Sequence, residues 1–145
     1  MTISIGSDHR GFDLKNLIYC HLCSRGYVVD DVGCNNSDSV DYPDYASLVA
    51  KKVASGEADI GILVCGSGIG MSIAANKTKG VRAALCFCAE TAKRSRLHNN
   101  ANVLCLGSDF MEGKEALKAV DNFVDTNFEG GRHQDRLNKI EQFIE

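Results

Sequence analysis

A repeated alternation of short apolar runs with longer amphipathic stretches constrains the fold of this chain more than any other feature. Runs such as TISIG and DIGILVC are separated by stretches whose apolar residues recur at helical spacing. Strands that alternate with helices pair in parallel and carry helices on both faces of the sheet. The run GILVC shows no polar alternation, as expected for a strand covered on both sides. The pattern predicts an α/β fold with a five-stranded parallel sheet, its strands at residues 2–6, 27–33, 59–65, 81–86 and 102–107. It also predicts a polar loop at 34–44 that contains Pro43, and helices that include residues 45–56, 113–128 and 132–145.

Length and composition favour one soluble domain spanning residues 1–145. Apolar residues make up 44% of the chain and charged residues 24%, and no interdomain linker or repeat is visible. The net charge of -3 disfavours nucleic acid as a partner, and no apolar run approaches the roughly 20 residues of a membrane span. The first residues lack the pattern of a secretory signal, and the seven cysteines cannot all pair within one chain. We therefore expect free thiols and a cytoplasmic location.

The carboxyl ends of the predicted strands carry the residues that suggest a binding site, as is usual in open α/β sheets. They read SDH at 7–9, CGSGIG at 65–70 and GSDF at 107–110. A glycine-rich turn that opens a helix presents free backbone N–H groups and lets a ligand approach closely. The segment 65–70 therefore predicts an anion site with Cys65 beside it. An equally weighted alternative is that Cys65 only ends a buried strand and that the glycines form a tight turn.

Several familiar catalytic and nucleotide-binding motifs match this sequence in part but lack one or two residues that each motif requires. The dinucleotide fingerprint and the cysteine phosphatase pattern both fail at Met71, and the phosphate loop of NTPases fails at Phe12 and Asp13. The nucleophile elbow would need a glycine where Cys65 stands. The pair Cys20 and Cys23 falls within a predicted helix without a second ligand pair, so a zinc or redox site is not expected there.

Histidines and arginines supply further candidates. His9 follows Asp8 at the end of the first strand, and His98 closes the helix before the last strand. Arg132 and Arg136 are four residues apart, so they share a helix face and suit a phosphate group. A solvated charged face is the alternative interpretation of this pair.

Six motifs in order along the chain are similar to those of one known family. They are SDHRGFDLK, DYPDYA, GILVCGSGIGMSIAANK, GVRAAL, SRLHNNANVLCLG and EGGRHQDRL, and they cover roughly residues 3 to 137. Together they resemble the type B ribose-5-phosphate isomerases. The resemblance implies a Rossmann-like α/β/α sandwich and a homodimer, or a dimer of dimers, with sites at the subunit interface. It also implies interconversion of ribose 5-phosphate and ribulose 5-phosphate through an enediolate, in the pentose phosphate pathway, without metal or cofactor.

The resemblance carries roles over to individual residues. It implies that Cys65 is the base at carbon 2 of the open-chain sugar and that His98 is the acid that opens the furanose ring. It implies that the loop Gly66–Gly70 holds the enediolate oxygen on its backbone N–H groups. The implied substrate-binding residues are Asp8, His9, Tyr42, Gly66, Ser67, Gly68, Ile69, Gly70, Asn99, Arg132 and Arg136.

One position departs from the family pattern, and alternatives remain open. Asp109 stands where the family usually carries an arginine that contacts the substrate, which leaves one phosphate contact unassigned. The related activities on allose 6-phosphate and galactose 6-phosphate are alternatives, although galactose-6-phosphate isomerase divides its site between two different subunits. A non-catalytic phosphate or nucleotide sensor is a further alternative. The presence of both Cys65 and His98 argues against it, because a sensor needs neither a proton acceptor nor a ring-opening acid.

Overall fold

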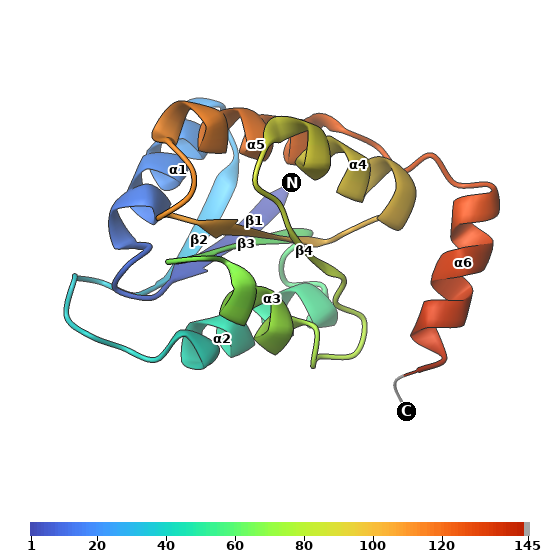
Figure 1. Ribbon diagram of the computed structural model, residues 1–145, viewed down its shortest axis with the longest axis horizontal. Coiled ribbons are helices and arrows are strands. Elements are labelled where there is room, and N and C mark those ends of the chain that lie inside the picture. The colour runs from blue at the N-terminus through green and yellow to red at the C-terminus, as the bar shows by residue number, and fades with distance from the viewer. Residues whose placement is uncertain (144–145) are drawn as a thin grey trace.

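The five strands lie parallel in one sheet with the order β2-β1-β3-β5-β4, as the computed structural model of this chain shows for residues 1–143 (Figure 1). The predicted α/β fold with a five-stranded parallel sheet is therefore confirmed. The strands are β1 (Thr2–Ser7), β2 (Val28–Gly33), β3 (Ile60–Cys65), β4 (Ala83–Leu85) and β5 (Val103–Gly107). The helices are α1 (Phe12–Ser24), α2 (Tyr42–Ser55), α3 (Ile69–Ala75), α4 (Ala89–Asn99), α5 (Gly113–Asp125) and α6 (Arg132–Glu141).

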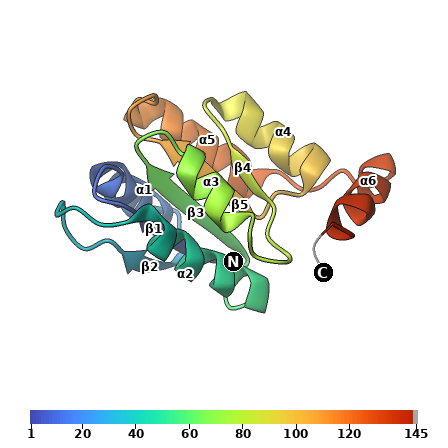
Figure 2. The ribbon, with the colours of Figure 1, turned by 60° about the horizontal axis from the view of Figure 1, so that its bottom comes forward.

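Two helical layers enclose the sheet and divide the core into two halves. Helices α1, α4 and α5 cover one face, and α2 and α3 cover the other (Figures 1 and 2). Along β3 the side chains alternate between the halves, with Ile62 and Val64 facing the first layer and Leu63 and Cys65 facing the second. The alternation directs the Cys65 thiol toward α2 and α3.

Helix α2 begins earlier than the sequence pattern predicted. The helix was expected from residue 45, but it begins at Tyr42, and Pro43 lies in its first turn. Proline is favoured there because its missing N–H would have no partner within the helix in any case. The earlier start places Tyr42 at the tip of α2, where its ring packs on Gly70.

The ends of the last two helices also differ from the expectation. Helix α5 ends at Asp125 rather than at residue 128. The last helix was expected to continue to residue 145. It spans Arg132–Glu141, and residues 144–145 of that expectation lie outside the described residues.

Helix α6 stands apart from the layers, beside the amino ends of β4 and β5 (Figure 1). Its contacts with the body are made by the buried Leu137 and His133 and by an ion pair of 2.7 Å between Glu141 and Arg82. A cavity of about 390 Å³ separates the rest of its inner face from the body. Within residues 1–143, none of the helices combines the length and the apolar character needed to cross a membrane.

Candidate active site

Three loops at the carboxyl edge of the sheet surround a cavity of about 470 Å³. They follow β1, β3 and β5, which are neighbours in the sheet. Helix α1 leaves β1 toward one face and α3 leaves β3 toward the other, which makes the gap between these strands a topological switch point (Figure 2). The cavity is lined by Asp8, Arg10, Tyr42, Cys65, Gly66, Ser67, Ile69, Gly70, Ile73 and Asp109.

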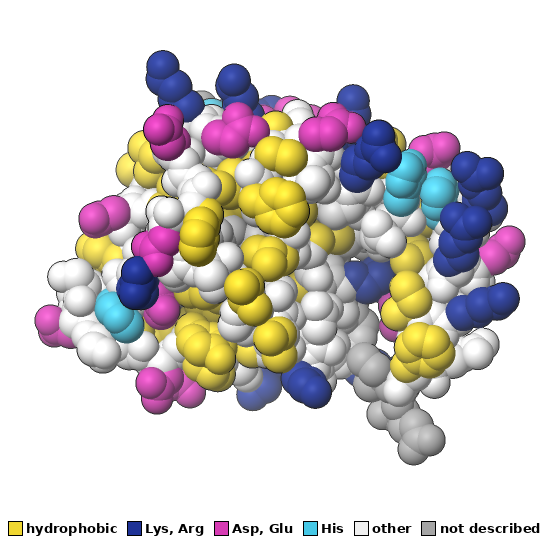
Figure 3. All heavy atoms as spheres, viewed as in Figure 1, with side chains coloured by type: hydrophobic (Ala, Val, Ile, Leu, Met, Phe, Trp, Pro, Cys, Tyr) yellow, Lys and Arg dark blue, Asp and Glu magenta, His cyan; other side chains and the backbone are white. Residues whose placement is uncertain are grey.

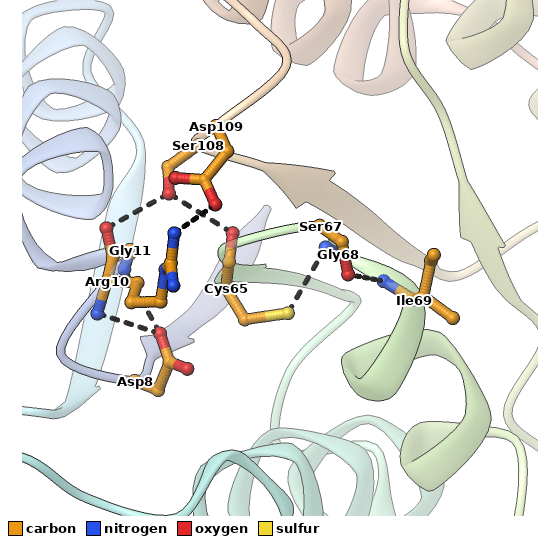
Figure 4. Close-up of polar contacts among 9 residues, drawn as sticks. All are labelled: Asp8, Arg10, Gly11, Cys65, Ser67, Gly68, Ile69, Ser108 and Asp109. Carbon is orange, nitrogen blue, oxygen red and sulfur yellow. Dashed lines mark hydrogen bonds and ion pairs between the residues drawn. The ribbon is translucent and has the colours of Figure 1, made fainter.

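The Cys65 thiol is held by the backbone of the loop that follows it (Figure 4). Its Sγ accepts a hydrogen bond of 3.1 Å from the N–H of Gly68, and only 4% of the residue is exposed. Gly68 has φ of +78°, and a Cβ there would lie 2.9 Å from the backbone carbon of Leu106. Both observations require glycine, and without it the N–H could not reach the sulfur. The next N–H, that of Ile69, donates to Ser67 Oγ at 3.2 Å.

The loop after β1 is fixed by a buried carboxylate. Asp8 Oδ1 accepts hydrogen bonds from the N–H groups of Arg10 at 3.0 Å and Gly11 at 3.1 Å. Gly11 packs so tightly that a Cβ there would lie 2.5 Å from the carbonyl oxygen of Val64. These contacts attach the loop to β3 and place Asp8 in the wall of the cavity.

The loop after β5 ties the other two loops together (Figure 4). The Ser108 hydroxyl donates to the Arg10 carbonyl at 3.0 Å and lies 3.3 Å from the Cys65 carbonyl, as Figure 4 shows. The Ser108 N–H donates to the same Cys65 carbonyl at 2.9 Å. Asp109 donates from its N–H to the Gly66 carbonyl at 2.9 Å, and its carboxylate forms an ion pair with the Arg10 guanidinium. The three loops therefore form one hydrogen-bonded unit, which suits a site that must hold its donors in place.

Most of the site residues expected around Cys65 are brought together. The cavity wall contains Asp8, Tyr42, Cys65, Gly66, Ser67, Ile69 and Gly70, while Gly68 acts through its N–H. His9 lies next to the wall but faces the loop before α2. Its Nδ1 accepts a hydrogen bond of 3.2 Å from the N–H of Val40, so the proton of the neutral ring is on Nε2.

The other expected residues, His98, Asn99, Arg132 and Arg136, lie at the opposite end of the sheet. Cys65 pairs with Gly107 at the carboxyl end of β5, whereas His98 and Asn99 precede the start of that strand at Val103. The five residues of β5 span about 16 Å at roughly 3.3 Å per residue. Arg132 and Arg136 are exposed on α6, near the same amino end. One chain therefore separates the two groups by at least the length of a strand.

A histidine pair organises this second group. The rings of His98 and His133 stack with centroids 4.4 Å apart and planes 13° apart. His98 Nε2 lies 3.7 Å from Glu129 Oε2. Burial, and next the proximity of His98, lower the pKa of His133 below its usual value. The lowered pKa favours the uncharged form of the His133 ring.

The same three residues are the candidate metal ligands of the described chain, but their geometry does not fit one ion. Ligand atoms of His98, Glu129 and His133 lie within 4.8 Å of one another. A ring nitrogen binds metal in the plane of its ring, at roughly 2.0–2.1 Å for zinc. Two nearly parallel stacked rings cannot both aim at one ion without rotating. The stack fits face-to-face packing of the two rings better than shared coordination of one ion.

The seven cysteines are free thiols in the structure, as expected. Burial raises the pKa of Cys105 well above its ordinary value, so that thiol stays neutral. Cys88 lies outside the core, and the hydroxyl and backbone of Thr91 lower its pKa. Neither residue lines the cavity that contains Cys65.

Sequence reasoning missed Arg10 and Ser108 as parts of the site. Ser108 belongs to the strand end 107–110 that had been singled out, whereas Arg10 lies one residue beyond the strand end 7–9. The available signal was position, because Arg10 directly follows Asp8–His9 and Ser108 directly follows Gly107. The ion pair between Arg10 and Asp109 joins residues 99 positions apart, so sequence spacing gave no indication of it.

Comparison with known proteins identifies the family. A model of the Ribose/Galactose Isomerase family matches residues 3–140. The probable ribose-5-phosphate isomerase B of Mycoplasma genitalium is 52% identical, over 95% of this chain and 92% of its own. The solved ribose-5-phosphate isomerase B of Clostridium thermocellum has a TM-score of 0.98 and 49% identity, covering 99% of this chain and 97% of that one. The Mycoplasma genitalium protein solved with bound ribulose-5-phosphate has a TM-score of 0.95 and 50% identity, covering 98% and 95%.

The class defined by the fold and the Cys65 cavity is thus an α/β protein of the ribose/galactose isomerase family. Within that family the chain belongs to the type B ribose-5-phosphate isomerases, as its six motifs predicted.

Proposed function

We propose that this protein interconverts ribose 5-phosphate and ribulose 5-phosphate, with Cys65 as the base. The observation that carries the proposal is the Cys65 sulfur at the wall of a cavity, held by the N–H of Gly68. The structural relative solved with ribulose-5-phosphate supports a sugar phosphate as the ligand. The chemistry needs only proton transfers, so the proposal includes no metal and no cofactor.

In the proposed mechanism His98 first passes a proton to the ring oxygen of ribose 5-phosphate while the anomeric hydroxyl loses its own proton, so that the carbon 1 to ring-oxygen bond breaks and the furanose opens to the aldehyde. The Cys65 thiolate then removes the proton from carbon 2, and the electron pair forms a double bond between carbons 1 and 2. The aldehyde oxygen becomes the enediolate oxygen and receives hydrogen bonds from backbone N–H groups of the loop 66–70. The Cys65 thiol then returns the proton to carbon 1, and the hydroxyl proton at carbon 2 passes to the oxygen on carbon 1, which gives ribulose 5-phosphate.

The proposed assembly is a homodimer, or a dimer of dimers, with each site shared between two copies. One chain holds Cys65 at one end of the sheet and His98 with the α6 arginines at the other. A second copy would bring its own His98, Arg132 and Arg136 to the Cys65 cavity, where they could oppose a phosphate and a sugar ring.

Exposed apolar surface supports this assembly. A band of hydrophobic side chains runs down one face, and further hydrophobic side chains lie on α6 (Figure 3). Ile69 lines both the Cys65 cavity and a neighbouring apolar pocket that contains Phe87 and Phe110, so apolar surface continues from the cavity into that pocket. Phe110 is 75% exposed and Phe87 64%. Contiguous apolar surface of this kind is typical of an interface.

A direct isomerase assay tests the proposed function. Ribose 5-phosphate should be converted, and Cys65→Ala should lower kcat by at least about 10²-fold while the melting temperature changes little, because positioned bases contribute 10²–10⁴-fold. Cys20→Ala is the matched control, since that thiol is exposed on α1. If Cys65→Ala keeps more than about a third of the wild-type kcat, the assignment of the base is wrong.

The same assay separates the alternatives. Faster turnover of allose 6-phosphate or galactose 6-phosphate than of ribose 5-phosphate would change the assigned substrate but leave the proposed proton transfers in place. Tight binding of sugar phosphate without turnover of any of the three would indicate a sensor. We also propose a cytoplasmic location, which the seven free thiols support.

A further inference from the structure

The charged rim of the Cys65 cavity contains one group to which the proposed mechanism gives no role. Among the described residues that line the cavity, Arg10 is the sole cation, and it lies between two carboxylates, those of Asp8 and Asp109. With one cation and two carboxylates the rim is negative overall, so a phosphate dianion entering this cavity would be repelled unless the guanidinium faced it directly.

The Arg10 side chain packs against the loop that follows Cys65. A Cβ at Gly66 would lie 2.8 Å from Arg10 Nε, 3.2 Å from Arg10 Cδ and 3.0 Å from Asp109 Oδ2. The guanidinium and the carboxylate therefore pack against the bare backbone of Gly66, next to the thiol. In Figure 4 the guanidinium points toward Asp109.

Both partners are positioned by their backbones rather than by the ion pair alone. The Arg10 N–H donates to Asp8, the Arg10 carbonyl accepts from Ser108, and the Asp109 N–H donates to the Gly66 carbonyl. The side chains of Arg10 and Asp109 are 58% and 42% exposed. An exposed pair of this kind contributes little to stability, so stability alone does not account for its position at the cavity.

The Arg10 guanidinium has more N–H donors than its ion pair with Asp109 uses. Arginine carries five N–H groups in a planar fork, and among the described residues its side-chain hydrogen-bond partner is Asp109, through Nη2. A fork can hold one carboxylate and still present its other N–H groups to a phosphate.

We propose that Arg10, oriented by Asp109, is a substrate-binding residue that contacts the phosphate of the sugar phosphate from the protomer that carries Cys65. This inference rests on the proposed function for its substrate. It also accounts for the aspartate at a position where the family usually carries an arginine, because the guanidinium comes from the loop after β1 instead.

Inorganic phosphate inhibition and the KM for ribose 5-phosphate test the proposal on the full-length protein. Arg10→Ala should raise both constants at least about tenfold, as expected for loss of a charge-assisted hydrogen bond, with kcat within about threefold of wild type. Arg94→Ala is the matched control, because Arg94 forms an exposed ion pair with Glu90 on α4, and it should leave both constants unchanged.

A second substitution separates ligand binding from a structural role of the pair. In Arg10→Ala the Asp109 carboxylate is left without its cation and should repel the phosphate. Adding Asp109→Asn should therefore improve phosphate binding at least about threefold over Arg10→Ala alone, although Asp109→Asn in the wild-type background should not improve it. A pair that only stabilised the loops would show no such recovery.

The outcomes are decisive in either direction. Constants for Arg10→Ala within about twofold of those for Arg94→Ala would overturn the proposal, as would a loss of kcat with an unchanged KM. Failure of the double substitution to recover phosphate binding would overturn the role of Asp109. Calorimetric titration with inorganic phosphate keeps the two proposals distinguishable. A wild-type protein that bound phosphate through Arg10 but did not isomerise ribose 5-phosphate would refute the proposed function alone.

Discussion

Replacing Gly68 by alanine tests whether the loop beside Cys65 is as tightly constrained as its geometry indicates. The residue has φ of +78°, and a conformation of this kind costs a residue with a Cβ about 1–2 kcal/mol. The new Cβ would also lie 2.6 Å from Leu85 Cδ1, which can move, and 2.9 Å from the backbone carbon of Leu106, which cannot move freely. Overpacking of this kind costs typically 1–3 kcal/mol, so the total loss of unfolding free energy is about 2–5 kcal/mol.

Gly26→Ala is the matched control for this substitution. Gly26 has φ of +86°, but nothing lies within 4 Å of a Cβ built there, so only the conformational part of the loss applies. Thermal unfolding should therefore show a larger fall in melting temperature for Gly68→Ala, at about 2–4 °C for each kcal/mol in a chain of this length.

The activity of Gly68→Ala is the second measurement. Displacing the loop moves the N–H that donates to Cys65 Sγ together with the neighbouring N–H groups proposed to hold the enediolate oxygen, and loss of one donor to an oxyanion lowers kcat by about 10²–10³-fold. Gly26→Ala should leave kcat unchanged. Equal melting temperatures for the two variants, together with a kcat for Gly68→Ala within about threefold of wild type, would refute the argument from close packing.

Three further predictions concern the residues at the amino end of the sheet. Arg132→Ala and Arg136→Ala should each raise the KM for ribose 5-phosphate at least about tenfold with a smaller effect on kcat, as initial rates will show. His98→Asn should slow the reaction from ribose 5-phosphate more than that from ribulose 5-phosphate, which has no furanose to open, and equal losses in both directions would contradict the role of His98. The pKa of His133 is lowered by burial and by His98, with smaller contributions from Arg132 and Arg136 that also lower it and from Glu129 that raises it. As the pH falls below about 6.5, the unfolded state therefore binds more protons at this position than the folded state does. Thermal unfolding between neutral and acid pH should show a larger loss of stability for the wild type than for His133→Asn. Parallel pH dependences for the two proteins would contradict this.

The fold could be predicted from the local sequence pattern, because the periodicity of apolar residues within each segment indicates a strand or a helix. The uninterrupted apolar run of β3 indicated a strand covered on both faces, and its residues do alternate between the two halves of the core. The start of α2 was misjudged because Pro43 was taken as part of a loop, although proline is compatible with a first helical turn.

The site could be predicted only where its residues lie close together in the sequence or directly after a predicted strand. The loop 65–70 and Asp8 were identified from strand ends, and they line one cavity. The separation of His98 and the α6 arginines from Cys65 follows from strand length and helix direction, which a list of motifs does not contain. The ion pair between Arg10 and Asp109 depends on β1 and β5 both lying next to β3, and strand order is set by packing of the whole chain.

Subunit complementation tests the central claim, an isomerase whose site combines Cys65 of one copy with His98 of another. Cys65→Ala and His98→Asn are each assayed alone on ribose 5-phosphate and then after mixing in equal amounts, with subunit exchange confirmed by native mass spectrometry. Random exchange makes half of the dimers mixed, each with one intact site, so the mixture should reach about a quarter of wild-type activity. A mixture that forms mixed dimers but gains no activity over the two variants alone would contradict a shared site and place all the catalytic groups within one chain.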